Sequence, residues 1–266
     1  MTTAYSRKWQ LTVLAALLSA PAILTAAPEP NIALQVIVQD FTWREDVGQP
    51  LRLKESGWLY GIGVNGRLRQ PERWQLHYRA QFYGGEVDYD GFLQYLDGRV
   101  EPYQAETRYL GAVGDLDASF LLNEGDAIPV RPFIGIGTRY WLRELDKREG
   151  FGYDEYWLTI YGRLGLNIEV PESSARTWFL SMALVVPVYN YEWAVDVPLL
   201  PDDNIELKPK RKLGQHLEAG VRGQRFQAAL FYEALNFGQS DLDRSGMFFQ
   251  PASEKRLAGL RVGMAF

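Results

Sequence analysis

Long segments of this sequence alternate apolar side chains with polar, charged or glycine residues, and this period of two restricts the possible folds more than any other feature. Alternation over many residues is the signature of β-strands, in which successive side chains point to opposite faces. The clearest segment covers residues 156–170. Its apolar face carries Tyr156, Leu158, Ile160, Gly162, Leu164, Leu166 and Ile168, and its other face carries Trp157, Thr159, Tyr161, Arg163, Gly165, Asn167 and Glu169. No stretch after residue 27 sustains a helical period, so the sequence predicts an all-β fold.

The direction of the apolar faces separates a soluble β-sandwich from a membrane barrel. The mixed faces carry Arg, Glu, Asp, His and many glycines, with few side chains suited to fill a dry core. The apolar faces are longer than those of globular strands, and they suit tilted membrane crossings of about 9 to 11 residues with extensions. A mean hydropathy of −0.22 excludes a bundle of transmembrane helices. We therefore predict a single antiparallel transmembrane β-barrel with apolar side chains toward lipid and charged side chains toward the lumen.

About ten segments show this pattern, and an even number is what a single-chain bacterial barrel requires. The connections after even-numbered segments are short, whereas several after odd-numbered segments are longer and acidic. Because such barrels have short periplasmic turns and longer external loops, we expect both termini of the barrel to be periplasmic. The predicted strands cover 31–46, 50–69, 72–90, 103–121, 128–145, 154–170, 177–194, 204–222, 224–238 and 248–266.

Aromatic residues gather near the ends of these segments, as they do in the belts that lie level with lipid headgroups. We expect one belt toward the outer end of the barrel and one toward the periplasmic end. The outer group is Trp43, Trp58, Tyr60, Tyr140, Tyr156, Tyr191 and Trp193. The periplasmic group is Trp74, Tyr78, Trp178, Phe226 and Phe266.

The N-terminal segment, residues 1–27, has the pattern of a cleaved secretory signal peptide. Arg7 and Lys8 precede an apolar stretch that ends in small residues, which is the order such signals require. Cleavage would leave the barrel as one domain, residues 28–266. A retained membrane anchor is the alternative interpretation.

Cysteine content and charge exclude several classes of protein. The chain has no cysteine, so it is neither a lipid-anchored lipoprotein nor a disulfide-stabilised domain. Without the basic residues of the signal segment it carries 26 basic and 33 acidic residues, a net charge of −7. This balance argues against a nucleic-acid partner.

The closing residues resemble the C-terminal signature of outer-membrane β-barrels, in which a terminal Phe follows apolar residues at alternate positions. Here these residues are Leu260, Val262, Met264 and Phe266. The segments 132–145 and 256–266 are also similar to a loosely defined group of uncharacterised small outer-membrane barrels. The resemblance implies that the last strand is bound by the barrel-assembly machinery during biogenesis. It also implies that the mature barrel lies among outer-membrane lipid and lipopolysaccharide.

Charged side chains on the mixed faces form the first candidate site, a polar cluster in the lumen. Positive and negative groups are nearly balanced, and the interior of a ten-stranded barrel is narrow. Because unpaired buried charges are costly, we expect these side chains to pair and to plug the lumen. A narrow solute path or a ligand pocket is the alternative. The cluster comprises His77, Arg79, Asp115, Asp117, Arg163, His216, Glu218, Glu233 and Arg261, with Asn65, Arg67, Arg139, Glu169 and Arg222 on the same register.

The two histidines of the chain, His77 and His216, both fall on the lumenal register near the predicted periplasmic turns. They lie on strands that stand about opposite each other in a ring of ten, near Arg79 and Glu218. A facing pair would respond to pH between about 5 and 8. Hydrogen-bonded structural roles are the alternative that we favour.

Asp88 and Asp90 lie at the predicted outer end of the third strand and resemble the aspartate pair of omptins, which are ten-stranded outer-membrane proteases. Those enzymes also use an Asp-His pair at the same rim. This sequence departs from the pattern, since His77 lies eleven residues from Asp88 and toward the opposite end of the barrel. A general base must lie within hydrogen-bond reach of the proton that it removes, so we expect no catalytic residues here.

The segment around residue 243 begins like a calcium-binding loop, with Asp241, Asp243 and Ser245 in a D-x-D-x-S-G pattern. The Glu expected at the twelfth position is absent, because Ala252 stands there. A solvated turn without metal is the simpler interpretation. No other motif predicts a cofactor.

The sequence therefore predicts a non-enzymatic outer-membrane barrel with a charged, largely plugged lumen. Such a protein would act through its outer loops or as a structural component of the envelope. A narrow channel or small-ligand binder that uses the lumenal charges is one alternative. A surface hydrolase similar to omptins is another.

Overall fold

The computed structural model describes residues 31–48, 53–69, 73–94, 99–123, 128–146, 152–173, 176–197 and 204–266. The predicted signal peptide, residues 1–27, lies outside them. Among these described residues, no helix is long and apolar enough to cross a membrane. The structure is instead all-β, as predicted.

Twelve strands form one antiparallel sheet within the described residues. They are β1 (Asn31–Asp46), β2 (Leu53–Arg69), β3 (Trp74–Gln94), β4 (Val100–Phe120), β5 (Val130–Leu145), β6 (Asp154–Ser173), β7 (Arg176–Val195), β8 (Ile205–Leu207), β9 (Lys210–Arg211), β10 (Gly214–Gly223), β11 (Phe226–Gly238) and β12 (Ala252–Ala265).

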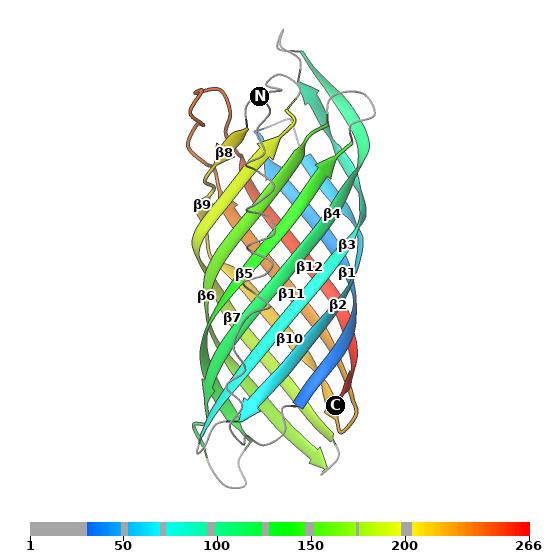
Figure 1. Ribbon diagram of the computed structural model, residues 1–266, viewed down its shortest axis with the longest axis vertical. Helices are drawn as coiled ribbons and strands as arrows, with labels where there is room; N and C mark the ends of the chain where they lie inside the picture. The colour runs from blue at the N-terminus through cyan, green and yellow to red at the C-terminus, as the bar shows by residue number, and fades with distance from the viewer. Residues whose placement is uncertain are drawn as a thin grey trace, which may run out of the picture.

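Ten of these strands, β1 to β7 and β10 to β12, close into a barrel within the described part of the chain. β1 pairs with both β2 and β12, and β7 pairs with β10, so the sheet returns to itself. The strands are strongly tilted against the long axis (Figure 1). β8 pairs with β7, and β9 pairs with β11, which extends the wall beyond the start of β10. The predicted single antiparallel barrel is confirmed.

The two ends of the barrel are named here by their connections. The turn end holds the start of β1, the end of β2 and the C-terminal residue Phe266, at the bottom of Figure 1. The loop end holds the connections from β1 to β2, from β3 to β4 and from β11 to β12.

The side chains follow the predicted alternation between a lipid-facing surface and a lumenal surface. Ile62, Ile134 and Leu230 are 64%, 67% and 67% exposed on the outside. Their counterparts on the inside, such as Arg139 and Glu233, are only 3% and 2% exposed. An apolar exterior around a polar interior is the opposite of a soluble fold and is what a membrane crossing requires.

The aromatic belts are present on the outer surface, with one exception. Trp74, Trp178 and Phe226 are exposed near the turn end. Near the loop end the rings of Tyr156 and Trp193 stack with centroids 5.0 Å apart. Other exposed or half-buried belt residues are Trp58, Tyr60, Tyr140 and Tyr191. The prediction for Trp43 was wrong, because its side chain is fully buried inside the barrel.

Several strand boundaries differ from the sequence-based expectation, and β12 begins at Ala252, four residues later than predicted. β3 and β4 pair continuously from Trp74–Phe120 to Gln94–Val100, so this hairpin extends several residues farther than predicted at the loop end. The predicted strand 204–222 is interrupted, because Pro209 lies between β8 and β9. Proline has no backbone N–H to donate to a neighbouring strand, and it breaks the ladder there.

Candidate functional site

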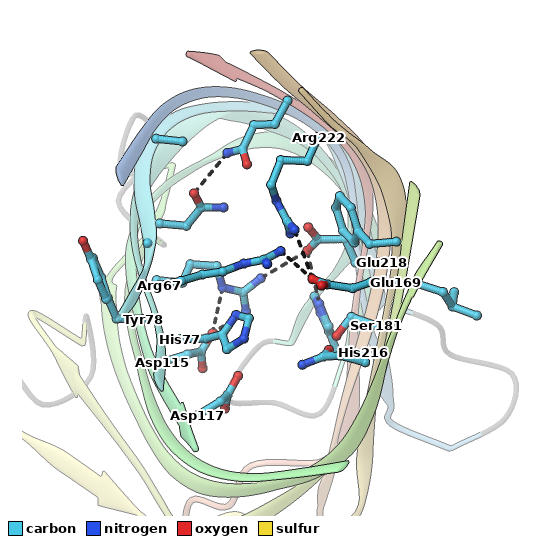
Figure 2. A pocket seen from close by; sticks show the side chains of 18 of the residues that line it. Arg67, His77, Tyr78, Asp115, Asp117, Glu169, Ser181, His216, Glu218 and Arg222 are labelled. Atoms are coloured by element: carbon cyan, nitrogen blue, oxygen red, sulfur yellow. Dashed lines mark hydrogen bonds and ion pairs between the residues drawn. The ribbon is translucent and has the colours of Figure 1, made fainter. Parts of the chain in front are cut away.

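The lumen has three zones along the barrel axis: a polar chamber at the turn end, an aromatic core toward the loop end, and an ion cluster beyond that core. The chamber is a cavity of about 110 Å³. In Figure 2 the charged side chains around it point toward one another from opposite walls, whereas Tyr78 lies outside the wall. The lining residues include His77, Arg79, Asp115, Asp117, Arg163, His216 and Glu218 from the predicted cluster.

Ion pairs connect the strands around the chamber, both neighbouring strands and strands separated by a third. The guanidinium Nε of Arg79 on β3 donates to the Asp115 carboxylate on β4 at 2.8 Å. Arg163 on β6 donates to Asp117 at 2.7 Å. Gly135 and Gly137 on β5, between β4 and β6, leave room for these contacts, because a Cβ at either position would lie within 2.5 Å of an aspartate oxygen. The glycines therefore let arginine and aspartate meet across an intervening strand.

The mouth of the chamber is held by one shared carboxylate. Glu169 on β6 forms an ion pair with Arg67 on β2 at 2.7 Å and accepts a hydrogen bond from Arg222 on β10 at 3.1 Å. Nearby, the Gln227 side chain donates to Asn65 at 3.0 Å. These groups are partly exposed, so the chamber opens toward the turn end.

A second set of charges closes the inner side of the chamber. His216 lies 3.3 Å from Glu233 and 3.5 Å from Glu218. Arg139 pairs with Glu233, and Arg261 pairs with Glu218. Eight of the nine residues of the predicted cluster thus belong to one network in the turn-end half of the lumen, and His77 lines the same chamber.

No contact between His77 and His216 occurs in the described part of the chain. His77 makes a hydrogen bond to the Gln75 side chain at 2.9 Å. His216 has the two glutamates as its partners instead. This arrangement favours separate structural roles over a facing pair.

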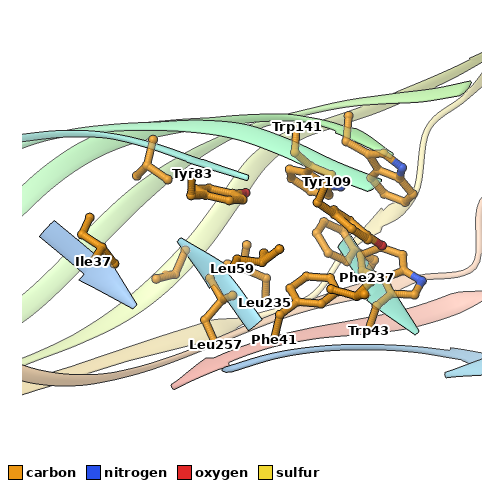
Figure 3. Close-up of a cluster of buried hydrophobic side chains, with 14 of the residues drawn as sticks. Ile37, Phe41, Trp43, Leu59, Tyr83, Tyr109, Trp141, Leu235, Phe237 and Leu257 are labelled. Carbon is orange, nitrogen blue, oxygen red and sulfur yellow. The ribbon is translucent and has the colours of Figure 1, made fainter. Parts of the chain in front are cut away.

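An aromatic core fills the lumen above the chamber. Phe41 and Trp43 come from β1, Tyr109 from β4, Trp141 from β5 and Phe237 from β11, and their rings converge from opposite walls (Figure 3). The residues of largest volume in this core, Trp43, Trp141 and Trp157, are all 0% exposed. The sequence-based expectation of few side chains suited to a dry core was wrong. Each contributing strand supplies only one or two buried inward aromatics, so no single segment carries an apolar inner face.

Lys255 on β12 lies at the boundary between the aromatic core and the chamber. Its ammonium nitrogen is 3.9 Å from the centroid of the Trp141 ring, and it donates to the Tyr83 hydroxyl at 2.9 Å. Cations over indole rings are attracted by the ring quadrupole. No ion pair of Lys255 occurs in the described part of the chain.

A buried ion cluster lies on the loop-end side of the core. Arg143 on β5 donates to Glu55 at 2.7 Å, to Glu155 at 2.8 Å and to Glu45 at 3.3 Å. Tyr109 also donates to Glu55. One guanidinium therefore joins β1, β2 and β6 across the lumen.

This ion cluster and Lys255 were not predicted from the sequence. The alternation along β5 was sufficient to predict that the Arg143 side chain faces the lumen. Arg143 lies two residues beyond Trp141 and four beyond the predicted lumenal residue Arg139, so all three share one face of the strand. Its three acidic partners come from strands distant in sequence, and the register that brings them together is not visible in a single segment.

The predicted sites outside the lumen lie apart from it. Asp88 and Asp90 are exposed on the outer surface of β3, whereas the intervening Tyr89 points inward. The two aspartates therefore face away from the lumen and from both histidines. Leu260, Val262, Met264 and Phe266 are all exposed on the lipid-facing side, at 42%, 38%, 58% and 73%.

The loop between β11 and β12 contains the calcium-like segment. The carboxylate of Asp243 accepts from the backbone N–H groups of Ser245, Met247 and Phe248 at 3.0 to 3.1 Å, and from the Ser245 hydroxyl. Desolvation acts to raise the pKa of Asp243, but these donors outweigh it and lower the pKa to about 2. Asp241 instead pairs with Lys210 at 3.0 Å. The loop is thus organised around Asp243 as a hydrogen-bonded turn. No group of three or more metal-ligating acidic or histidine side chains occurs in the described ranges.

Comparisons with known proteins support the fold alone. No family model matches the sequence, and no curated protein is similar to it in sequence. The outer-membrane protease OmpT from Escherichia coli is similar in structure, with a TM-score of 0.51, 10% identity and coverage of 92% of this chain and 99% of that one. An outer-membrane channel from Pseudomonas putida has a TM-score of 0.41 and 10% identity over 93% of this chain and 99% of that one. The chain has the fold of bacterial outer-membrane β-barrels.

Proposed function

We propose that this protein is a non-enzymatic component of the bacterial outer membrane, with a lumen closed to solutes and a loop end that faces outward. The observation that carries the proposal is the aromatic core. Trp43, Trp141 and Trp157 meet Phe237 with ring centroids 5.3 to 6.0 Å apart, and these side chains come from β1, β5, β6 and β11. Ring centroids at these separations are typical of aromatic side chains in contact, which supports a closed lumen.

The charges on either side of the core support a structural role for the lumen. Arg143 on one side and the Arg139–Glu233 pair on the other are buried and joined to carboxylates of other strands. A conducting pore needs charges that exchange partners with passing ions. Buried pairs held by several strands instead restrain the barrel in one register.

The arrangement of the acidic residues supports a non-enzymatic role. Asp88 and Asp90 point away from the barrel axis, and neither histidine lies at the loop end. Hydrolysis of a peptide bond by an aspartate pair requires a base and a positioned water in one concave site. The loop end therefore acts by presenting a surface, through the long β3–β4 hairpin and the loop between β11 and β12.

Solute entry into proteoliposomes tests the proposal. Liposomes that contain the purified protein are diluted into isotonic solutions of small sugars or amino acids, with a known porin as the positive control. We expect no swelling above that of empty liposomes. Swelling that scales with the amount of protein would contradict a closed lumen.

The polar chamber favours a second candidate function, the binding of a small polar ligand from the turn-end side. Its volume of about 110 Å³ suits a ligand of a few heavy atoms, and Arg67, Arg222 and Glu169 line its mouth. Calorimetry with phosphate, glycine or acetate tests this function. Substitutions Arg163→Gln and Glu218→Gln should abolish any binding, while Arg108→Gln on the outer surface should leave it unchanged.

A further inference from the structure

Four basic residues form a patch on the outer surface of the barrel at the loop end. The basic patch is defined here as Lys208, Lys210, Arg211 and Lys212, within the segment 207–213. All four side chains are exposed. Such a concentration is unusual in a chain whose overall net charge is −5.

The local backbone explains why these side chains project outward. β8 buries Ile205 and Leu207 and exposes Glu206, so Lys208 follows on the outer side by alternation. Pro209 then interrupts the ladder before β9. After this break Lys210, Arg211 and Lys212 are all exposed, without the burial of every second side chain that the regular strands of the wall show.

The patch lies level with the aromatic belt at the loop end. Leu207 pairs with Glu192, and Glu206 pairs with the belt residue Trp193. Arg211 donates to the backbone carbonyl of Val188 on β7 at 3.4 Å, and Val188 itself is 59% exposed on the lipid-facing side. The basic groups therefore stand at the boundary between the apolar wall and the loops, where lipid headgroups lie.

Within the described residues, Lys210 is the one member of the patch that forms an ion pair. Lys210 pairs with Asp241 at 3.0 Å, but both side chains are largely exposed. In the described part of the chain, Lys208, Arg211 and Lys212 make no ion pair. Elsewhere on the outer surface, Arg108 pairs with Glu144 at 3.4 Å. Among the described residues, the patch thus presents three positive charges without an ion-pair partner at headgroup level.

We propose that the basic patch binds the phosphate groups of an anionic glycolipid, the lipid A part of lipopolysaccharide, in the membrane leaflet at the loop end. The ammonium and guanidinium groups contact phosphate oxygens, and the acyl chains lie along the exposed apolar side chains of Val188 and Leu213 below. The inference rests on the proposed outward direction of the loop end. Each basic residue near an anionic surface contributes about 1 kcal/mol, so three residues correspond to roughly 100-fold in affinity.

The test uses the full-length mature protein in phosphatidylcholine nanodiscs that contain lipid A with both phosphates, lipid A without phosphates, or no lipid A. The readouts are the thermal unfolding midpoint and the number of lipid A molecules retained in native mass spectrometry. The test variant carries Lys208→Gln, Arg211→Gln and Lys212→Gln. A control variant carries Arg44→Gln, Lys54→Gln and Arg108→Gln, three exposed basic residues whose cross-strand neighbours include Glu254, Asp90 and Glu144.

Phosphorylated lipid A should raise the unfolding midpoint and remain bound in the native protein and in the control variant, with about 100-fold weaker retention in the test variant. Equal retention by both variants would overturn the inference. The inference would also be overturned if dephosphorylated lipid A, or inorganic phosphate added without lipid A, raised the unfolding midpoint as much as phosphorylated lipid A does. Solute entry is a separate readout, so a conducting lumen would overturn the proposed function and leave this result intact.

Discussion

The indole rings of Trp141 and Trp157 lie stacked inside the barrel, with centroids 5.2 Å apart and planes 10° apart. The two residues pair in register on β5 and β6, and both are fully buried. The Lys255 ammonium lies 3.9 Å from the centroid of the Trp141 ring, and Trp43 meets both rings edge-on. The stack therefore joins the aromatic core to the polar half of the lumen.

The substitution Trp141→Ala should destabilise the barrel by about 3 to 5 kcal/mol, because it opens a large cavity in a well-packed core. It also removes the ring that the Lys255 ammonium contacts. Urea unfolding in lipid vesicles measures the change. Trp178→Ala is the matched control, since Trp178 is 50% exposed on the outer surface and should cost much less. Equal losses in the two variants would show that the core is not tightly packed.

Replacement of Arg143 by Met should destabilise the protein by about 3 to 5 kcal/mol, because it leaves the carboxylates of Glu45, Glu55 and Glu155 buried without their shared cation. The same unfolding assay applies. The double variant Arg143→Met with Glu55→Gln should recover part of the loss, since it removes one of the uncompensated charges. A double variant that is less stable than Arg143→Met would contradict this account.

The loop between β11 and β12 should lose order in acid. Its Asp243 carboxylate accepts several hydrogen bonds, and its pKa in the folded loop is about 2 compared with an ordinary value of 3.8. A lowered pKa means that the ionised form stabilises the fold. The stabilisation is present above about pH 4 and is lost as the pH falls through about 2.

Hydrogen exchange at the Phe248 amide, whose acceptor is Asp243, reports this change. Asp243→Asn should abolish the pH dependence between about pH 4 and 2, whereas Asp241→Asn should keep it. Identical profiles for the native protein and Asp243→Asn would show that this carboxylate does not organise the loop.

The loop end should be accessible from outside the cell. Because the chain has no cysteine, a single introduced cysteine is the one thiol that a maleimide can label. Ser245→Cys in the exposed loop between β11 and β12 should react with a membrane-impermeant maleimide in intact cells. Arg225→Cys in the turn between β10 and β11 should react only after the outer membrane is permeabilised. The reverse pattern would invert the proposed orientation and place both termini outside.

Strand number and side-chain direction were predictable from the sequence, because alternation depends only on neighbouring residues. The apolar series from Leu158 to Ile168 indicated which face of β6 meets lipid, and lumenal residues such as Arg163 and Glu233 then followed by parity. The break at Pro209 lay within a segment that otherwise alternates, and the continuous strand predicted there was wrong.

The contacts within the lumen were not predictable in the same way. The aromatic core and the Arg143 cluster depend on the stagger between strands, which brings Glu45 and Glu155 to one level although they are distant in sequence. Trp43 is the clearest example of a side chain whose position was predicted wrongly from the sequence. Its place near a strand end predicted a belt residue, whereas its parity with Ile37 and Phe41 sends it into the core.

Single-channel recording in planar bilayers tests the closed lumen most directly. The native protein, inserted at a density verified by antibody labelling, should give no discrete conductance steps at any applied voltage that the bilayer tolerates. The variant with Trp141→Gly and Trp157→Gly, if it inserts, should give steps, because it removes the stacked rings from the lumen. Discrete openings of the native protein, altered by Arg163→Gln or Glu218→Gln, would contradict the account and establish a channel through the polar chamber.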